Sequence, residues 1–510
     1  MKRAKSNKLL FSDNEWTFER IRQTTDVCEQ IAVDELKLDF YPNQIEIISS
    51  EQMLDAYASI GMPVMYQHWS WGKSFVQNEH SYRKGLQGLA YEIVINSNPC
   101  ISYLMEENTM TMQALVIAHA ACGHNSFFKS NELFKQWTDA DGIIDYLVFA
   151  RDFINSCEER YGSEAVESTL DHCHALMTHG VDKYRRPNKL SAVKERERQQ
   201  QREEYVQTTL NDLWRTLPTS AVADNAGSTD RNFVERRKRL NLPEENILYF
   251  LEKKAPLLKP WQREICRIVR KISQYFYPQK QTKVMNEGHA SYTHYYIMNR
   301  LGELGYINDS SMLEFLHSHT NVVRQVGFDH PGYSGFNPYA LGFEIFSDIR
   351  RICTNPTDED REWFPDLVGE HWLDAYHHAM TNFRDESFIR QYLSPTVMRK
   401  LRLFAVYDDA EAREYEVSRI HNERGYRELR SSLANQYNVG DLDPDIQVWD
   451  VDLQNDRCLY LRHTIKNGRT LSNNTNQVLM HMQKLWGYDV KLESFDPIQN
   501  KVVETFIVRA

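Results

Sequence analysis

The sequence predicts a mainly α-helical protein with a smaller α+β domain at its C-terminal end. With 510 residues, the chain is too long for one ordinary core and has the length of about three domains. Hydrophobic residues make up 41% and aromatic residues 12% of the sequence, which is enough to fill a packed interior. Up to about residue 400 the apolar residues mostly recur at helical spacing, whereas beyond it they alternate with polar residues as in strands.

Helical patterns organise the first 400 residues. We expect helices at 18–36, 109–119, 261–277, 285–304, 311–318 and 342–353, a strand at 91–96, and a strand or helix start at 44–48. Between the two helical parts, the charged tract 194–204 and the small, polar stretch 221–231 indicate a solvated helix followed by a linker. This predicts an N-terminal helical segment at 1–186, the charged helix and linker at 187–246, and a second helical segment at 247–400 that packs on the first.

The tail, 401–510, forms the predicted α+β domain. Alternating apolar and polar residues predict six strands, at 401–407, 415–420, 445–452, 458–463, 489–494 and 501–508. Helices at about 422–437 and 474–486 separate them. The order strand, strand, helix occurs twice, which suggests an internal duplication.

Charge and composition exclude several classes of protein. The net charge of −11 and the pI of about 5.9 disfavour nucleic acid and anionic lipid as partners. The basic N-terminus lacks the apolar stretch of a secretory signal, and no run approaches the roughly 18 apolar residues of a membrane span. Eight scattered cysteines without a CxxC pair indicate reduced, buried thiols. We therefore expect a cytoplasmic protein.

A first histidine pair, His119 and His124, lies in the apolar stretch that begins at residue 109. Zinc peptidases of the HExxH type place two histidines four residues apart on one helical face. Here the spacing is five, about 140° on a regular helix, so both can bind one ion only if the helix bulges or ends near Gly123. Ala120 also stands where such a peptidase carries its general base. An ordinary metallopeptidase is therefore disfavoured.

The second constellation surrounds Glu287, in the sequence Asn-Glu-Gly-His-Ala-Ser-Tyr. It resembles the helix on which gluzincin aminopeptidases carry a glutamate as their third zinc ligand. The resemblance implies a distantly gluzincin-like helical core and one divalent metal ion, zinc favoured, held by His119, His124 and Glu287 with an open position for water. His294 lies two helical turns from Glu287 on the same face and is a further ligand candidate. In the alternative interpretation, the histidines cap a helix and Glu287 pairs with an arginine such as Arg263.

Three further residues are candidate catalytic groups, each with a structural alternative. Tyr339 could donate to a developing oxyanion, as a tyrosine does in gluzincins, or only shape a turn. His319 could act as a proton shuttle or end a helix. Glu107 could act as an acid or favour the N-terminal dipole of the helix at 109–119.

Longer motifs resemble those of the SpoVR family (stage V sporulation protein R). They lie at residues 88–96, 123–129, 281–288, 317–323, 337–342 and 385–388. The resemblance covers nearly the whole chain, with one departure, because relatives usually carry tryptophan where this chain has His289. It implies a role in spore cortex formation or in stress and cell-envelope physiology.

Two functions remain open under this resemblance. One is a divergent or inactive metal-dependent hydrolase. The other is a non-catalytic scaffold that joins a PrkA-type serine kinase and a von Willebrand A-like protein through the 194–204 tract and the C-terminal domain. A homo-oligomer stays open as well.

Overall fold

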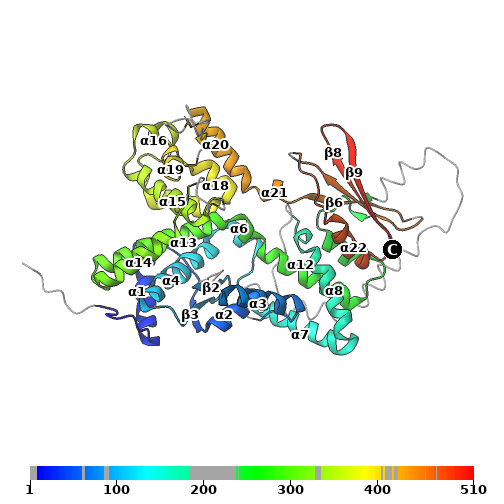
Figure 1. Cartoon of the computed structure of the whole chain (residues 1–510), viewed down its shortest axis with the longest axis horizontal. Coiled ribbons are helices and arrows are strands. Elements are labelled where there is room, and N and C mark those ends of the chain that lie inside the picture. The colour runs from blue at the N-terminus through cyan, green and yellow to red at the C-terminus, as the bar shows by residue number, and fades with distance from the viewer. Residues whose placement is uncertain are drawn as a thin grey trace, which may run out of the picture. The chain divides into compact units, whose positions relative to one another are not determined.

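A computed structural model describes residues 9–59, 62, 64–84, 91–182, 237–238, 240–327, 333, 335–403, 406–407, 416–417, 423–453, 455–466 and 468–510. The predicted charged tract 194–204 and polar stretch 221–231 lie outside these residues. The chain is mainly helical with a smaller sheet-containing C-terminal part, as predicted (Figure 1). None of the helices in the described ranges is long and apolar enough to cross a membrane.

The chain divides into two compact units, each assembled from several stretches of sequence. The first contains Met1–Pro63, Gly72–Gln136 and Pro278–Asn438, and the second contains Val64–Trp71, Trp137–Tyr277 and Val439–Ala510. The helices predicted within the described residues all occur, with bounds that differ by a few residues. The elements that lie wholly in the first unit are α1 (Phe18–Asp34), β1 (Asn43–Ile48), α2 (Ser50–Ala58), β2 (Glu92–Ile95), β3 (Cys100–Met105), α4 (Met110–Ile117), η1 (Ala118–His124), α5 (Asn125–Ser130), α13 (Lys283–Glu303), α14 (Asp309–Val322), α15 (Pro338–Thr354), α16 (Asp358–Trp363), α17 (Trp372–Asn382), α18 (Asp385–Tyr392), α19 (Pro395–Lys400), β4 (Val406–Tyr407), β5 (Glu416–Val417) and α20 (Glu423–Gln436).

A small sheet precedes the first predicted site helix. Its strand order is β1-β3-β2, with β1 parallel and β2 antiparallel to β3. A turn after β3 leads to Thr109, whose side chain accepts from the backbone N–H of Met112 and so caps the start of α4. The sheet therefore places the beginning of β2 beside the helix that follows β3.

The helix that begins as α4 does not stay regular. Over η1 (Ala118–His124) it becomes a π-helix, and then it continues as α5. Every residue from Met110 to Phe128 is buried. The helix predicted at 109–119 is thus part of a longer, fully buried segment whose central turn is wider than an α-helical turn.

Small residues let α13 approach its neighbours closely. A Cβ atom at Gly123 of η1 would lie 2.6 Å from the Ala290 Cα of α13. On another side of α13, a Cβ at Gly288 would overlap the backbone of Gly342 in α15. The first turn of α13 is fixed by the buried Asp385, whose oxygens accept from the backbone N–H groups of Val284 and Met285. These contacts determine where the first turns of α13, and with them Glu287, lie.

The second unit combines helices with a four-stranded sheet. Its elements include α7 (Ile143–Tyr161), α8 (Ser163–Ala175), η2 (Met177–His179), α11 (Ile247–Lys254), α21 (Val439–Leu442), β6 (Asp445–Val451), β7 (Leu459–Thr464), α22 (Thr475–Trp486), β8 (Val490–Asp496), β9 (Lys501–Val508) and most of α12 (Pro260–Gln281). Helices α3 (Trp69–Arg83) and α6 (Glu132–Trp137) each contribute residues to both units.

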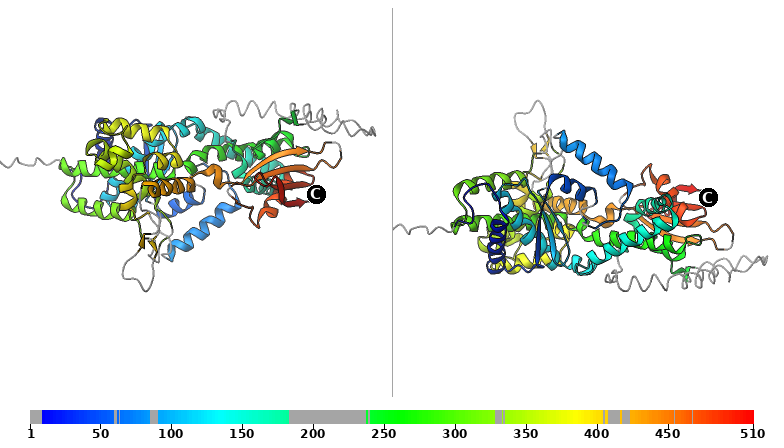
Figure 2. Two further views of the ribbon diagram at one scale, coloured as in Figure 1. Left: turned by 90° about the horizontal axis from the view of Figure 1, so that it is seen from above. Right: turned by 90° about the horizontal axis from the view of Figure 1, so that it is seen from below.

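The C-terminal sheet has the order β6-β7-β8-β9, and α22 packs against β8 and β9 (Figure 2). Four of the six predicted tail strands correspond to these four. The strand predicted at 401–407 is only partly present, because residues 401–403 follow α19 without strand pairing and β4 has two residues. The strand predicted at 415–420 is likewise represented by the two residues of β5.

Candidate metal site

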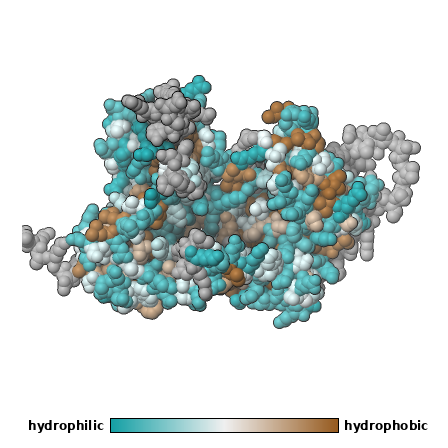
Figure 3. Space-filling model, in the orientation of Figure 1, coloured by the Kyte–Doolittle hydropathy of each residue, from teal (hydrophilic) through white to brown (hydrophobic). Residues whose placement is uncertain are grey.

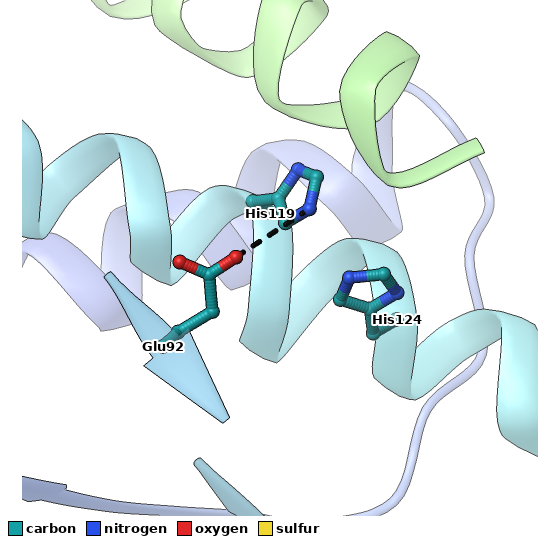
Figure 4. Close-up of side chains that lie close together, drawn as sticks. All are labelled: Glu92, His119 and His124. Atoms are coloured by element: carbon teal, nitrogen blue, oxygen red, sulfur yellow. Dashed lines mark ion pairs between the residues drawn. The ribbon is translucent and has the colours of Figure 1, made fainter. Parts of the chain in front are cut away.

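Four buried or half-buried side chains from three separate elements converge in the first unit. Glu92 begins β2, His119 and His124 lie in η1, and Glu287 lies in the second turn of α13. Figure 4 shows Glu92 and the two imidazoles facing one another, with the ion pair between Glu92 and His119. The ligand atoms of these three residues all lie within 4.8 Å of one another.

The π-helix explains how histidines five residues apart face the same point. In a helix with i→i+5 hydrogen bonds, residues i and i+5 lie nearly above each other instead of about 140° apart. The two imidazole rings are accordingly 4.6 Å apart between centroids. The bulge that the five-residue spacing requires is thus present.

Glu287 faces both imidazoles at distances longer than a hydrogen bond. Its Oε2 lies 3.5 Å from His124 Nε2 and 3.8 Å from His119 Nε2, while Glu92 Oε1 lies 3.7 Å from His119 Nε2. Glu287 Oε2 is buried and, among the described residues, finds no partner with hydrogen-bond geometry. Atoms that bind one tetrahedral ion at about 2.0–2.2 Å lie roughly 3.3–3.6 Å apart. The 3.5 Å separation lies in this range and the 3.8 Å separation is slightly longer, so these two imidazoles and the carboxylate come close to the spacing of a divalent metal site.

The outward nitrogens of both histidines have partners that orient the rings. His124 Nδ1 lies 2.9 Å from Asn286 Oδ1, so it donates to this amide oxygen and leaves Nε2 toward Glu287. His119 Nδ1 lies 2.9 Å from His294 Nδ1, and His294 Nε2 lies 2.8 Å from His319 Nδ1. Proteins commonly hold metal-binding imidazoles by such contacts at the ring nitrogen that faces away from the metal.

Burial and the facing charges shift the pKa values in opposite directions. Burial raises the pKa of Glu92. Burial also acts to raise the pKa of Glu287, but the two neighbouring histidines lower it overall. For His119, burial acts to lower the pKa, yet the two carboxylates raise it overall, whereas burial and the nearby His119 lower the pKa of His124 to about 4.

The histidines behind His119 are held neutral. Burial lowers the pKa of His294 well below its usual value and that of His319 to about 4, and proximity to His119 acts in the same direction. The cluster therefore combines Glu287, whose lowered pKa favours the carboxylate, and His119, whose raised pKa favours the protonated ring, with three histidines of lowered pKa.

The other predicted site residues fall into two groups. Tyr339 lies beside Glu287, and burial together with this carboxylate raises the pKa of its phenol. His294 and His319 form the chain behind His119, and both ring nitrogens of His294 are within 2.9 Å of other histidines. Glu107 lies exposed in the turn between β3 and α4, away from the contacts described for this cluster. His289 faces elsewhere, contacting Ser126 and Tyr376 at 2.9 and 2.7 Å.

Glu92 is the member of the cluster that the sequence interpretation did not select. It stands at the start of the apolar run 92–95, where a charged residue is unusual in a half-buried strand. That signal, an acid at the start of a short apolar strand within a family motif, could have identified it.

Two protein-family models match nearly the whole chain. The family described as SpoVR like protein matches residues 15–442. The chain belongs to the SpoVR family. The SpoVR-like C-terminal domain matches residues 444–497, and the four residues of the candidate cluster lie within the first match. A relative from Escherichia coli (strain K12), named uncharacterized protein YcgB, is 57% identical over 479 residues, which cover 94% of this SpoVR chain and 92% of the relative. No solved structure matches the chain.

Proposed function

We propose that this SpoVR-family chain binds one divalent metal ion, zinc favoured, and is a divergent metal-dependent hydrolase. The observation that carries the proposal is the buried Glu287 Oε2, which faces two imidazole nitrogens at 3.5 and 3.8 Å without a hydrogen bond among the described residues. Two histidines and a carboxylate are a ligand set of catalytic zinc sites.

His119, His124 and Glu287 would hold the ion. When bound, such an ion supplies Lewis acidity and activates water. Glu92 reaches the cluster from β2 and is placed to act as the general base that Ala120 cannot provide. Tyr339, which lies beside Glu287, would donate a hydrogen bond to charge that develops on a substrate oxygen.

Metal content of the purified full-length protein tests the proposal. Elemental mass spectrometry should find about one divalent ion per chain in the wild type and in the control variant His317→Ala. His317 is a matched control because it lies exposed on α14, hydrogen-bonded to Asn321. Glu287→Ala and the double variant His119→Ala/His124→Ala should lose it. The variants must keep the wild-type circular dichroism spectrum.

The role of Glu92 needs a separate variant. Glu92→Gln removes the proton-accepting carboxylate but retains its size, so it should keep the metal and lose hydrolytic activity against a screened panel of esters and amides. A wild-type protein that binds no ion under metal-replete expression would contradict the metal site. It would favour the non-catalytic scaffold instead.

A further inference from the structure

Strand β9 forms one edge of the C-terminal sheet. It pairs with β8 along its length, and within the described ranges no strand pairs with its outer side. The opposite edge of the sheet differs, because an antiparallel bridge between Glu244 and Val448 extends it beyond β6. Among the described residues, nothing pairs with the outer backbone groups of β9, which is the arrangement of an edge strand open to a further strand.

This edge is unusually apolar for an exposed strand. Val502, Val503 and Ile507 expose 43%, 51% and 54% of their surface, and Ile498 in the preceding turn exposes 94%. Figure 3 shows hydrophobic residues at the tip and along the side of the β8–β9 hairpin. Proteins usually protect such edges with proline, charges, a bulge or a very short strand. β9 has eight residues and no proline, and its charged residues are Lys501 and Glu504. The pairing of β9 with β8 has one bulge or irregularity, at Val503. Residues 504–508 pair regularly with β8.

We propose that β9 pairs antiparallel with β9 of a second copy of this chain, joining two four-stranded sheets into one. A two-fold axis perpendicular to the sheet makes the same strand edge complementary to itself, so one surface serves as both partners. Strand addition of this kind is a common mode of recognition.

The side chains favour an axis at Thr505 over one at Glu504. An axis at Glu504 would place two glutamates directly opposite each other, which is unfavourable. An axis at Thr505 pairs the two threonines, and it brings Val503 of each copy, the extra residue at the irregularity of β9, near Ile507 of the other. Only the strand ends then bring like charges, Lys501 and Arg509, into opposite positions, where both side chains are exposed and screened by solvent.

This self-complementary register favours a second copy of the chain over an unrelated strand as the partner of β9. The exposed apolar residues on either side of Thr505 cover each other in the pair. Thr505, at the axis, is a small, uncharged β-branched residue that suits a close cross-strand contact.

A cysteine at the axis tests the proposal in the full-length protein. Thr505→Cys should form a disulfide-linked dimer on mild oxidation, with little background because all eight native cysteines are buried. Ile498→Cys, which is more exposed but lies outside the strand, is the matched control and should remain mostly monomeric under the same conditions.

Sedimentation at several concentrations provides a second test without cross-linking. The wild type should show a monomer–dimer equilibrium, and Val503→Lys/Ile507→Lys should weaken it by at least about tenfold. A wild type that stays monomeric at every concentration would overturn the proposal. So would a dimer that the lysine variant leaves unchanged, or equal cross-linking by the two cysteine variants.

Discussion

At the residue scale, the candidate site depends on which ring nitrogen of each histidine faces the carboxylates. His119 contacts His294 through Nδ1, and His294 contacts His319 through Nε2. If His119 donates from Nδ1 to His294 and His294 donates from Nε2 to His319, rather than the reverse, His119 Nε2 keeps a lone pair directed at Glu287. His294 is then a positioning residue that fixes the orientation and tautomer of His119.

Replacing His294 should therefore weaken metal binding without abolishing it. We expect His294→Leu to lower the affinity for zinc by about 10–100-fold, as for other residues behind a metal ligand. Competition with a chromophoric chelator measures the affinity. At saturating zinc the variant should still bind one ion. Complete loss of the ion would instead make His294 a direct ligand, and an unchanged affinity would remove its positioning role.

A second residue-scale prediction concerns the buried Asp360. Burial alone would raise its pKa, but bonds to Arg351 and Thr357 lower it from 3.8 to about 2. Because the folded pKa lies below the unfolded one, this carboxylate stabilises the fold above about pH 4, and the contribution disappears as pH falls toward 2.

Asp360→Asn should reproduce that dependence. At pH 7 it should lower the free energy of unfolding by roughly 1–2 kcal/mol. Urea denaturation at pH 7, 4 and 3 checks the sign, since the difference from wild type should shrink as the pH falls. A difference that stays constant with pH would show that the loss comes from packing.

At the element scale, the sequence predicted both site helices but not the shape of the first. The spacing of His119 and His124 showed that a bulge was required, and the structure places a π-helix there. The sequence located the irregularity near Gly123 but could not show whether the helix bulges or ends there, because every residue from Met110 to Phe128 is buried and no polar stripe marks the helical period. Glu92 was missed for a different reason. Its strand reaches the histidines only through the pairing of β2 with β3.

The close contact between η1 and α13 gives an element-scale prediction. In Gly123→Ala the new methyl group would meet the Ala290 Cα at 2.6 Å, and backbone cannot move aside cheaply. We expect the free energy of unfolding to fall by roughly 1–3 kcal/mol and zinc affinity to fall with it.

Chemical denaturation measures the effect of that substitution. The matched control is Gly72→Ala in helix α3, where a Cβ would meet nothing within 4 Å. Because alanine favours helix by about 1 kcal/mol over glycine, the control should be neutral or slightly stabilising. Equal effects at the two glycines would mean that the contact with Ala290 does not constrain η1.

At the scale of the whole molecule, the predicted fold class, mainly helical with a smaller α+β C-terminal part, is confirmed. The stretches of sequence that make up each compact unit could not be predicted from the sequence. Each compact unit draws on three stretches of sequence. Helical periodicity finds the elements but cannot show that residues 64–71 and 439–510 belong to one unit, because contacts between distant segments leave no local pattern. The site, by contrast, lies wholly within the first unit.

Metal removal should consequently affect one unit more than the other. A bound ion would connect β2, η1 and α13, so ligand present at 100 times its dissociation constant should stabilise their unit by about 2.7 kcal/mol. Hydrogen exchange with and without zinc should show added protection in peptides from these elements and none in β6–β9. In Glu287→Ala, zinc should produce no change. Protection that spreads equally over both units would mean that they unfold together, and protection confined to β6–β9 would place the metal elsewhere.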